Sequence, residues 1–383
     1  MDTILGSSQD QLRRDRTSVK WVAFEPDVLP VWVAEMDAAP CPAVVDAVTA
    51  AVRRGDTGYD FGVPYAQAAS GYAAQHWGWS FDHRSTMGFA DVMIGIEAIV
   101  RTVTGPGDTV IVSPPVYDSF YGFVTTTGRP RLDVPLTASG RLDLAALEAA
   151  FAAASAGGGR AAYLLCNPHN PTGTVHTRTE LTALAELAAG HHITVISDEI
   201  HAPLVYPGGD PFTPYLTVAD EGLAFAVWSA SKAWNLAGFK AAVAVAGPGS
   251  LPDLARIHEV HTHGVGHIGS IAHIAAFTQG QPWLEQVITE LDANRRLLAD
   301  LLARELPDVA MAVPDATYLA WLDCRGLELG DNPAAVFLER GRVALSAGPH
   351  YGAHCGRGFA RFNFATSPEI IAEAVSRMAA SLR

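Results

Sequence analysis

The sequence is poor in cysteine and in basic residues. Its four cysteines, Cys41, Cys166, Cys324 and Cys355, are far apart and form no CxxC pair. This spacing is typical of free thiols in a reducing compartment, and it argues against a disulfide framework. The formal net charge is −14 at pH 7. Such a surface repels phosphate backbones, so a nucleic-acid partner is not expected.

Long apolar runs are also missing. The longest lies near Leu223–Trp228 and is far too short to span a bilayer. The N-terminal stretch MDTILGSSQDQLRRDR has no apolar segment of the kind that signal peptides carry. We therefore expect a soluble, cytoplasmic protein without a membrane partner.

The length of 383 residues is enough for one large domain and a smaller one. Short apolar runs alternate with helical patterns in its central part. Continuously apolar runs are typical of buried, mostly parallel strands, and the alternation predicts an α/β fold with a doubly wound sheet. The predicted strands are Thr109–Ser113, Ala161–Cys166, Thr194–Ser197, Ala224–Trp228 and Ala242–Ala246. The predicted helices between them are Ile96–Val103, Asp143–Ala154 and Arg178–Ala189.

The pattern changes near Trp283. A long helix over Leu284–Arg304 is followed by shorter elements, which predicts a smaller α+β domain. The segment before Pro40 has few helix signals and is expected to pack with this second domain. The predicted division is therefore an N-terminal segment, 1–40, a large domain, 41–283, and a small C-terminal domain, 284–383.

Four motifs stand at the ends of predicted strands or at the start of a helix. In a doubly wound fold, ligands bind outside the carboxyl ends of the strands, so these motifs are expected to converge on one crevice. They are CNPHNPTG at Cys166–Gly173, SDEIH at Ser197–His201, SASK at Ser229–Lys232, and a glycine turn at Met93–Glu97 that opens a helix.

The motifs supply what pyridoxal 5′-phosphate (PLP) requires of a protein. A Schiff-base lysine needs a partly buried setting, and Lys232 lies among small and apolar residues. A buried carboxylate such as Asp198 keeps the pyridine nitrogen protonated. The phosphate needs N–H groups at a helix start, hydroxyls and one cation. Gly95–Glu97, Ser229, Ser231 and Lys240 are the candidates for that task.

The order NPxNPTG, SDE and SxSK, with a basic residue eight positions later, resembles the fold-type I, aspartate-aminotransferase-like PLP enzymes. Nearly the whole chain shares the resemblance. It is more specifically similar to the MalY/PatB-type cystathionine β-lyases. That likeness rests on LPVWVAEMD at Leu29–Asp37, GYDFGVP at Gly58–Pro64, SPPVYDSF, SDEIH, GQPWLEQ at Gly280–Gln286, and the C-terminal VALSAGPHYG and GFARFNFA.

The resemblance implies a role for each matching residue. Lys232 would be the Schiff-base lysine, Asp198 the partner of the pyridine nitrogen, and Asn170 the donor to the phenolic oxygen. Tyr117 would stack on the cofactor ring, and Arg361 would bind the substrate α-carboxylate. The implied phosphate ligands are Ile96, Glu97, Ser229 and Lys240, joined by Tyr59 from the second subunit of a homodimer with shared active sites.

One position separates two possible reactions. Aminotransferases of this superfamily usually have tyrosine three residues after the aspartate, whereas this chain has His201, as the lyases do. We therefore predict a carbon–sulfur β-lyase that cleaves L-cystathionine or a related cysteine S-conjugate. An aminotransferase acting on amino acids is the alternative enzyme. A regulatory protein that only binds PLP is the alternative from another class.

Two further patterns are given no function. Gly264–Gly269 matches GxGxxG, but it follows a histidine-rich stretch instead of a strand, so a dinucleotide site is not predicted. The nearby histidines have no fixed ligand spacing, so no metal is predicted. They are His258, His261, His263, His267 and His273.

Overall fold

The computed structural model describes residues 3–219 and 222–383. The chain divides into two compact units. The larger unit comprises 40–168 and 175–282, and the smaller comprises 1–39, 169–174 and 283–383. The short stretch His169–Thr174 thus groups with the smaller unit, although the sequence pattern assigned it to the large domain. Its contacts explain this, because the N–H groups of Asp315 and Ala316 both donate to the Gly173 carbonyl, at 3.0 and 2.9 Å.

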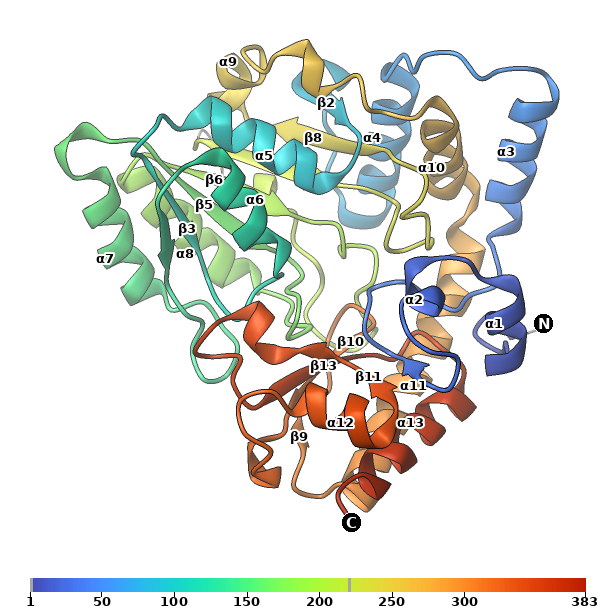
Figure 1. Ribbon diagram of the computed structural model, residues 1–383. Helices are drawn as coiled ribbons and strands as arrows, with labels where there is room; N and C mark the ends of the chain where they lie inside the picture. Colours follow the sequence, from blue (N-terminus) through green and yellow to red (C-terminus); the bar gives the residue numbers. More distant parts are fainter. Residues whose placement is uncertain (1–2, 220–221) are drawn as a thin grey trace. The chain divides into compact units, whose positions relative to one another are not determined.

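The larger unit alternates strands and helices as predicted (Figure 1). Its strands are β2 (Thr86–Phe89), β3 (Thr109–Val112), β4 (Arg131–Asp133), β5 (Ala161–Cys166), β6 (Ile193–Asp198), β7 (Ala224–Trp228) and β8 (Ala242–Ala246). Its helices are α3 (Pro42–Arg53), α4 (Val63–Trp77), α5 (Val92–Val103), α6 (Ser119–Thr127), α7 (Leu144–Ser155), α8 (Arg178–Gly190), α9 (Leu251–Leu254) and α10 (His267–Gln279).

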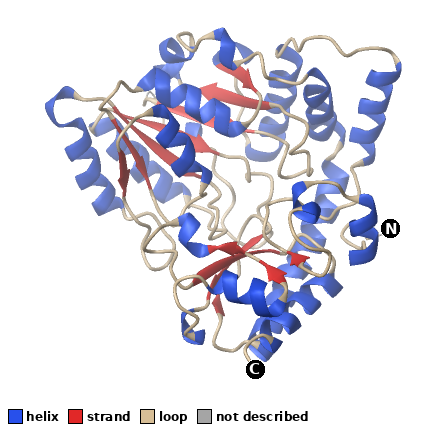
Figure 2. Ribbon diagram, in the orientation of Figure 1, coloured by secondary structure: helices blue, strands red, loops and turns tan. Residues whose placement is uncertain are grey.

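The seven strands form one sheet in the order β2-β8-β7-β6-β5-β3-β4. Pairing is parallel from β7 through β4, and β8 is antiparallel to both β7 and β2. This mostly parallel sheet with helices on its faces confirms the predicted α/β fold class (Figure 2).

Two apolar cores cover the two faces of the sheet. Successive side chains of a strand point to opposite faces, and in β3 Val110 and Val112 join the core beneath α5 and α6, whereas Ile111 joins the core beneath α7 and α8. Strands that are buried on both faces appear in the sequence as continuous apolar runs. The bounds of β5, β7 and β8 could therefore be predicted correctly.

The start of α5 differs from the prediction. Met93–Glu97 is not a turn, because α5 begins at Val92, after the N-cap residue Asp91. A Cβ added to Gly95 would lie 3.1 Å from a ring carbon of Phe89 and 3.3 Å from Val227. Close packing of the helix on the sheet therefore accounts for this glycine better than a turn does.

The smaller unit holds a four-stranded antiparallel sheet and a two-stranded parallel one. The first has the order β12-β13-β10-β9, and the second pairs β1 with β11. Its strands are β1 (Leu29–Pro30), β9 (Ala310–Met311), β10 (Leu319–Asp323), β11 (Val343–Ala344), β12 (Ser346–Ala347) and β13 (Phe359–Asn363). Its helices are α1 (Gln9–Asp15), α2 (Val19–Val22), α11 (Gln281–Glu305), α12 (Pro333–Gly341) and α13 (Pro368–Ala380). The N-terminal segment thus contains two short helices that the sequence did not indicate.

No helix within 3–219 or 222–383 has the length and apolar character needed to cross a membrane.

Candidate active site

The carboxyl ends of the central strands bring the predicted motifs of the larger unit together. Cys166 of β5 pairs with Asp198 of β6, and Asp198 pairs with Val227 of β7. The segment after each strand therefore starts at the same edge of the sheet. Asn167 follows β5, His201 follows β6, and Lys232 follows β7.

Asp198 carries a buried carboxyl group at this edge, with 3% of the residue exposed. Its Oδ1 accepts a hydrogen bond from the Ile200 N–H at 3.1 Å. Burial raises the pKa of Asp198 to about 7, against the hydrogen bond from Ile200 and the positive charge of Lys232, which both lower it. The fold thus buries a carboxyl group with a lysine close enough to influence its ionisation.

Lysine is scarce in this protein, which has only Lys20, Lys232 and Lys240. Lys20 is fully buried in the smaller unit, where its Nζ lies 2.8 Å from Asp37 Oδ2. Lys240 is largely exposed and pairs with Asp91 at 3.0 Å. Lys232 alone is half-buried beside the strand ends. Of the three, it is the one whose setting suits a reactive amine.

Ser229 begins the turn that presents Lys232. Its hydroxyl donates to the Ala241 carbonyl at 2.8 Å and accepts from the Ser231 N–H at 3.1 Å. These two bonds shape the turn between β7 and the start of β8. The hydroxyl hydrogen of Ser229 is therefore used within the protein, which gives this residue a structural role beside the predicted one.

The N-terminus of α5 differs from the turn in which the phosphate ligands Ile96 and Glu97 were expected. Ile96 and Glu97 lie in its second turn, where N–H groups bond to carbonyls four residues earlier, and Glu97 pairs with Arg101 through its side chain. In the first turn, Ile94 donates to Asp91 Oδ1 and Gly95 to the Asp91 carbonyl. The N–H groups of Val92 and Met93 are the ones that the helix leaves available. Asp91 is the N-cap residue of α5 and forms an ion pair with Lys240. An aspartate at this position is the sequence signal that could have indicated where the helix begins.

Two further predicted residues lie in the larger unit. Tyr117 is half-buried, packs against the core beneath α5 and α6, and meets Phe120 edge-on with ring centroids 6.1 Å apart. His201 is buried, with 2% exposed, in the turn after β6. Both positions are consistent with the predicted crevice.

Arg361 and Asn170 lie together in the smaller unit. The Nη1 group of Arg361 donates to Asn170 Oδ1 at 3.1 Å, and its Nη2 group donates to the Trp32 carbonyl at 2.9 Å and to Ser346 Oγ at 3.3 Å. The guanidinium carbon lies 4.9 Å from the centroid of the Tyr351 ring. Its Nε is buried without a partner among the described residues. The sequence pattern predicted Arg361 as a site residue but not its neighbours Ser346 and Tyr351, nor Trp32, which is far from it along the chain.

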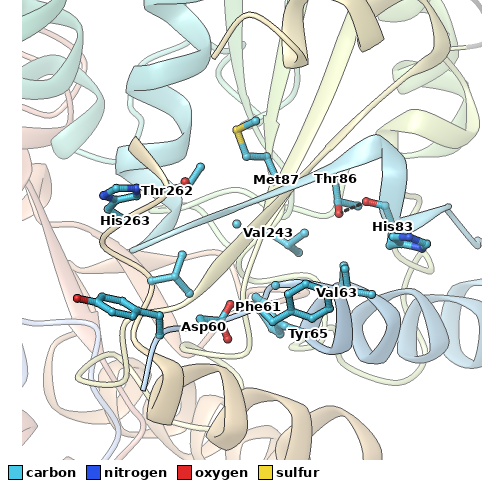
Figure 3. Close-up of a pocket in the computed structure, with 15 residues that line it drawn as sticks. Asp60, Phe61, Val63, Tyr65, His83, Thr86, Met87, Val243, Thr262 and His263 are labelled. Atoms are coloured by element: carbon cyan, nitrogen blue, oxygen red, sulfur yellow. Dashed lines mark hydrogen bonds between the residues drawn. The ribbon is translucent and has the colours of Figure 1, made fainter. Parts of the chain in front are cut away.

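Tyr59 borders an open pocket of about 750 Å³ in the larger unit. Figure 3 shows Asp60, Phe61 and Tyr65 along one side of this pocket and Thr86 and Met87 of β2 along another. In the isolated chain Tyr59 is fully exposed, and 77% of Phe61 is exposed. Of the predicted site residues, only Tyr59 lines this pocket.

Within the described part of the chain, no cluster of three or more histidine, cysteine, aspartate or glutamate side chains could hold a metal ion. The GxGxxG match at Gly264–Gly269 spans the start of α10 and follows a short 3-10 turn, Glu259–His261. It does not follow a strand, which is the context that a dinucleotide site requires.

Comparison with known proteins gives one consistent result. The family model "Aminotransferase class I and II" matches residues 76–378. A Mycobacterium tuberculosis protein named "Putative cystathionine beta-lyase" is 50% identical over 97% of this chain and 96% of its own. "Cystathionine beta-lyase PatB" of Bacillus subtilis is 33% identical over 95% and 96%. A Corynebacterium diphtheriae crystal structure, described as a "putative plp-dependent beta-cystathionase", is 33% identical, covers 99% of both chains and superposes with a TM-score of 0.92.

Proposed function

The chain belongs to the aminotransferase class I and II family, and from this premise we propose that it is a PLP-dependent carbon–sulfur β-lyase. Its substrate would be L-cystathionine or a related cysteine S-conjugate, and its products a thiol, pyruvate and ammonia. Relatives at 50% and 33% identity carry the name cystathionine β-lyase over almost their full lengths. The observation that carries the proposal is the buried Asp198 at the strand ends, with Lys232 near enough to lower its pKa.

The residues of the larger unit fit PLP. Burial raises the pKa of Asp198 to about 7, since Ile200 and Lys232 compensate its negative charge only in part. A protonated pyridine nitrogen is an N–H donor with a positive charge, and it would supply that compensation. The first-turn N–H groups of Val92 and Met93, with Lys240 on the capping Asp91, suit a phosphate at the start of α5.

When bound, PLP supplies an electron sink for a negative charge that develops at Cα of an amino acid. Asp198 would hold the proton on the pyridine nitrogen, which keeps that sink effective. Tyr117 would provide an aromatic face for the ring, and His201 would border the same edge. Asn170 would donate its amide N–H to the phenolic oxygen, since its Oδ1 already accepts from Arg361.

Lys232 would bind the cofactor covalently until the substrate amine displaces it, and the freed lysine amine would then act on the substrate as a general base. Its amine would remove the proton from Cα. Loss of the thiolate from Cβ would follow, and water would complete the release of pyruvate and ammonia. Arg361 would orient the substrate through its α-carboxylate, a task for which a guanidinium is suited.

A pyruvate assay separates this reaction from the aminotransferase alternative. Holoenzyme given L-cystathionine without a keto acid should release many equivalents of pyruvate per subunit. A transaminase would stop after one half-reaction until a keto acid is added. Product that forms only with added keto acid would contradict the lyase proposal, and the absence of any turnover would favour a protein that only binds PLP.

We also propose a cytoplasmic homodimer in which Tyr59 reaches the phosphate of the partner's site. A fully exposed tyrosine next to an exposed Phe61 favours burial by a second copy. Four cysteines without disulfide bonds are in keeping with a reducing compartment. Mixing inactive Tyr59→Ala and Lys232→Ala protomers should restore part of the activity, since hybrid dimers contain one intact site. A fully active monomer in light scattering would contradict the proposal.

A further inference from the structure

Glu199, next to Asp198, has a buried carboxyl group that the proposed mechanism does not use. Only 1% of the residue is exposed. Its Oε1 accepts from the Tyr215 N–H at 2.8 Å and from the Ser197 hydroxyl at 3.0 Å. Its Oε2 is buried and has no hydrogen-bond donor within the described residues. A buried acceptor without a donor is costly, so the state of this oxygen needs a physical account.

The side chain of Asn167 also has a buried acceptor without a donor. Its Nδ2 donates to the Thr213 carbonyl at 3.1 Å, which fixes the orientation of the amide. Its Oδ1 is therefore the second buried acceptor, and it too has no donor in the part of the chain that the structure describes. The Asn167 side chain is also close enough to Glu199 to influence its ionisation. A protonated carboxyl group at Glu199 would supply the donor that these two buried acceptors lack.

The surroundings of Glu199 favour the protonated form. Burial raises its pKa to about 8, with a smaller contribution in the same direction from the negative charge of Asp198. The Tyr215 N–H and the Ser197 hydroxyl act in the opposite direction but do not reverse the shift. Asn167 would also lower the pKa if its Nδ2 donated to Glu199, but that nitrogen donates to the Thr213 carbonyl. The direction of this shift favours a protonated Glu199 at neutral pH.

We propose that Glu199 is a neutral carboxylic acid that donates its proton to Asn167 Oδ1, and that it acts as a positioning residue for Asp198. The backbone supports this role. The Asn167 N–H donates to the Asp198 carbonyl, and the Glu199 N–H donates to the Val227 carbonyl, both at 2.9 Å. The proton on Glu199 adds a side-chain bond to these, so the ends of β5, β6 and β7 are fixed around Asp198.

The neutral state has a chemical consequence, which rests on the proposed function of Asp198. A carboxylic acid at Glu199 leaves Asp198 as the one negative charge of the pair. The two carboxyl groups then have separate tasks. Glu199 holds the strand ends with its proton, and Asp198 interacts with the cofactor ring.

The proton on Glu199 is measurable through the pH dependence of stability. Ordinary glutamate ionises near pH 4.3, so between about pH 5 and 7 unfolding of the holoenzyme releases one proton that Glu199→Gln does not carry. The raised pKa stabilises the fold at low pH, and this contribution is lost as the pH rises. The ratio of unfolding constants, wild type to Glu199→Gln, should therefore increase about tenfold per pH unit. The exposed Glu148→Gln on α7 is the matched control and should leave the ratio constant. A constant ratio for Glu199→Gln would overturn the proposal.

A second pair of variants tests positioning. Glutamine can donate an N–H to Asn167 Oδ1, whereas leucine of similar volume cannot. Glu199→Leu should bind PLP at least tenfold more weakly than Glu199→Gln, and equal affinities would refute the positioning role. If Glu199→Gln does not fold, infrared spectra of wild-type holoenzyme labelled with ¹³C in glutamate alone decide the protonation state. A band of protonated glutamic acid at pH 7 is expected, and its absence would overturn the proposal. None of these measurements uses lyase turnover, so a failed lyase assay would not count against Glu199.

Discussion

Asp198 and Arg361 are both buried ionisable residues, but their side chains differ in the hydrogen-bond partners that surround them. The Asp198 carboxyl group accepts a hydrogen bond from the Ile200 N–H, and burial raises its pKa to about 7. Arg361 donates to Asn170, Trp32 and Ser346. The hydrogen bond from Ile200 and the positive charge of Lys232 therefore do not offset the burial of Asp198. Arg361 is instead held by several acceptors before any substrate arrives, which fixes its guanidinium in place.

The largest effect is expected at the lysine that acts beside Asp198. Lys232→Ala should abolish turnover, because no other lysine of the larger unit is both half-buried and next to the strand ends. PLP should still bind without a covalent bond. Steady-state pyruvate release is the measurement, and a kcat near that of the wild type would show that the assignment of Lys232 is wrong.

The uncompensated carboxyl group gives the next largest effect. Asp198→Asn keeps the shape of the side chain but removes the charge that keeps the pyridine nitrogen protonated. We expect kcat to fall by more than about 100-fold, roughly 2.7 kcal/mol in the barrier. Circular dichroism must show an intact fold. A loss below about tenfold would mean that Asp198 does not have this role.

Sequence patterns predicted the larger unit well where burial is complete. The strands β5, β7 and β8 have continuous apolar residues, and their bounds agree with the prediction. The edge strands β2 and β4 were missed, because they are short and contain polar residues, of which Thr86 is half-buried and Arg131 and Asp133 are exposed. Single-sequence periodicity has little to detect in such strands.

The candidate site likewise contains residues that the sequence could predict and residues that it could not. The residues of continuous motifs, such as Asp198 and Lys232, could be named from the sequence. The acceptors around Arg361 could not, because Trp32 and Ser346 reach it only through the pairing of distant segments. Ile96 and Glu97 were predicted as phosphate ligands with Gly95 interpreted as part of a turn, whereas Gly95 lies in α5 and permits its close packing on Phe89.

The prearranged guanidinium predicts a smaller, substrate-specific effect. Arg361→Lys keeps the positive charge but removes the planar group that contacts Asn170 and Trp32. We expect kcat/KM for cystathionine to fall about 10- to 100-fold, which corresponds to the 1.5–3 kcal/mol of a hydrogen bond to a charged group. The visible absorbance of the bound cofactor should be retained. Arg325→Lys, an exposed change in the same unit, is the control and should behave as wild type.

Ser346→Ala should have the smallest effect of the series. Its hydroxyl lies 3.3 Å from Arg361 Nη2, and the Trp32 carbonyl still holds that nitrogen at 2.9 Å. A loss of about 2- to 5-fold in kcat/KM is expected, equivalent to roughly 0.5–1 kcal/mol. A loss as large as that of Arg361→Lys would show that the guanidinium is not held by several partners.

Covalent attachment of the cofactor to Lys232 is the central claim, and the scarcity of lysine makes it directly testable. The holoenzyme can be reduced with borohydride, digested and mapped by mass spectrometry, with three lysines as the possible positions. We expect the reduced cofactor on the peptide that contains Lys232. Recovery of the label on Lys20 or Lys240, or no labelled lysine in a protein that still releases pyruvate, would contradict it.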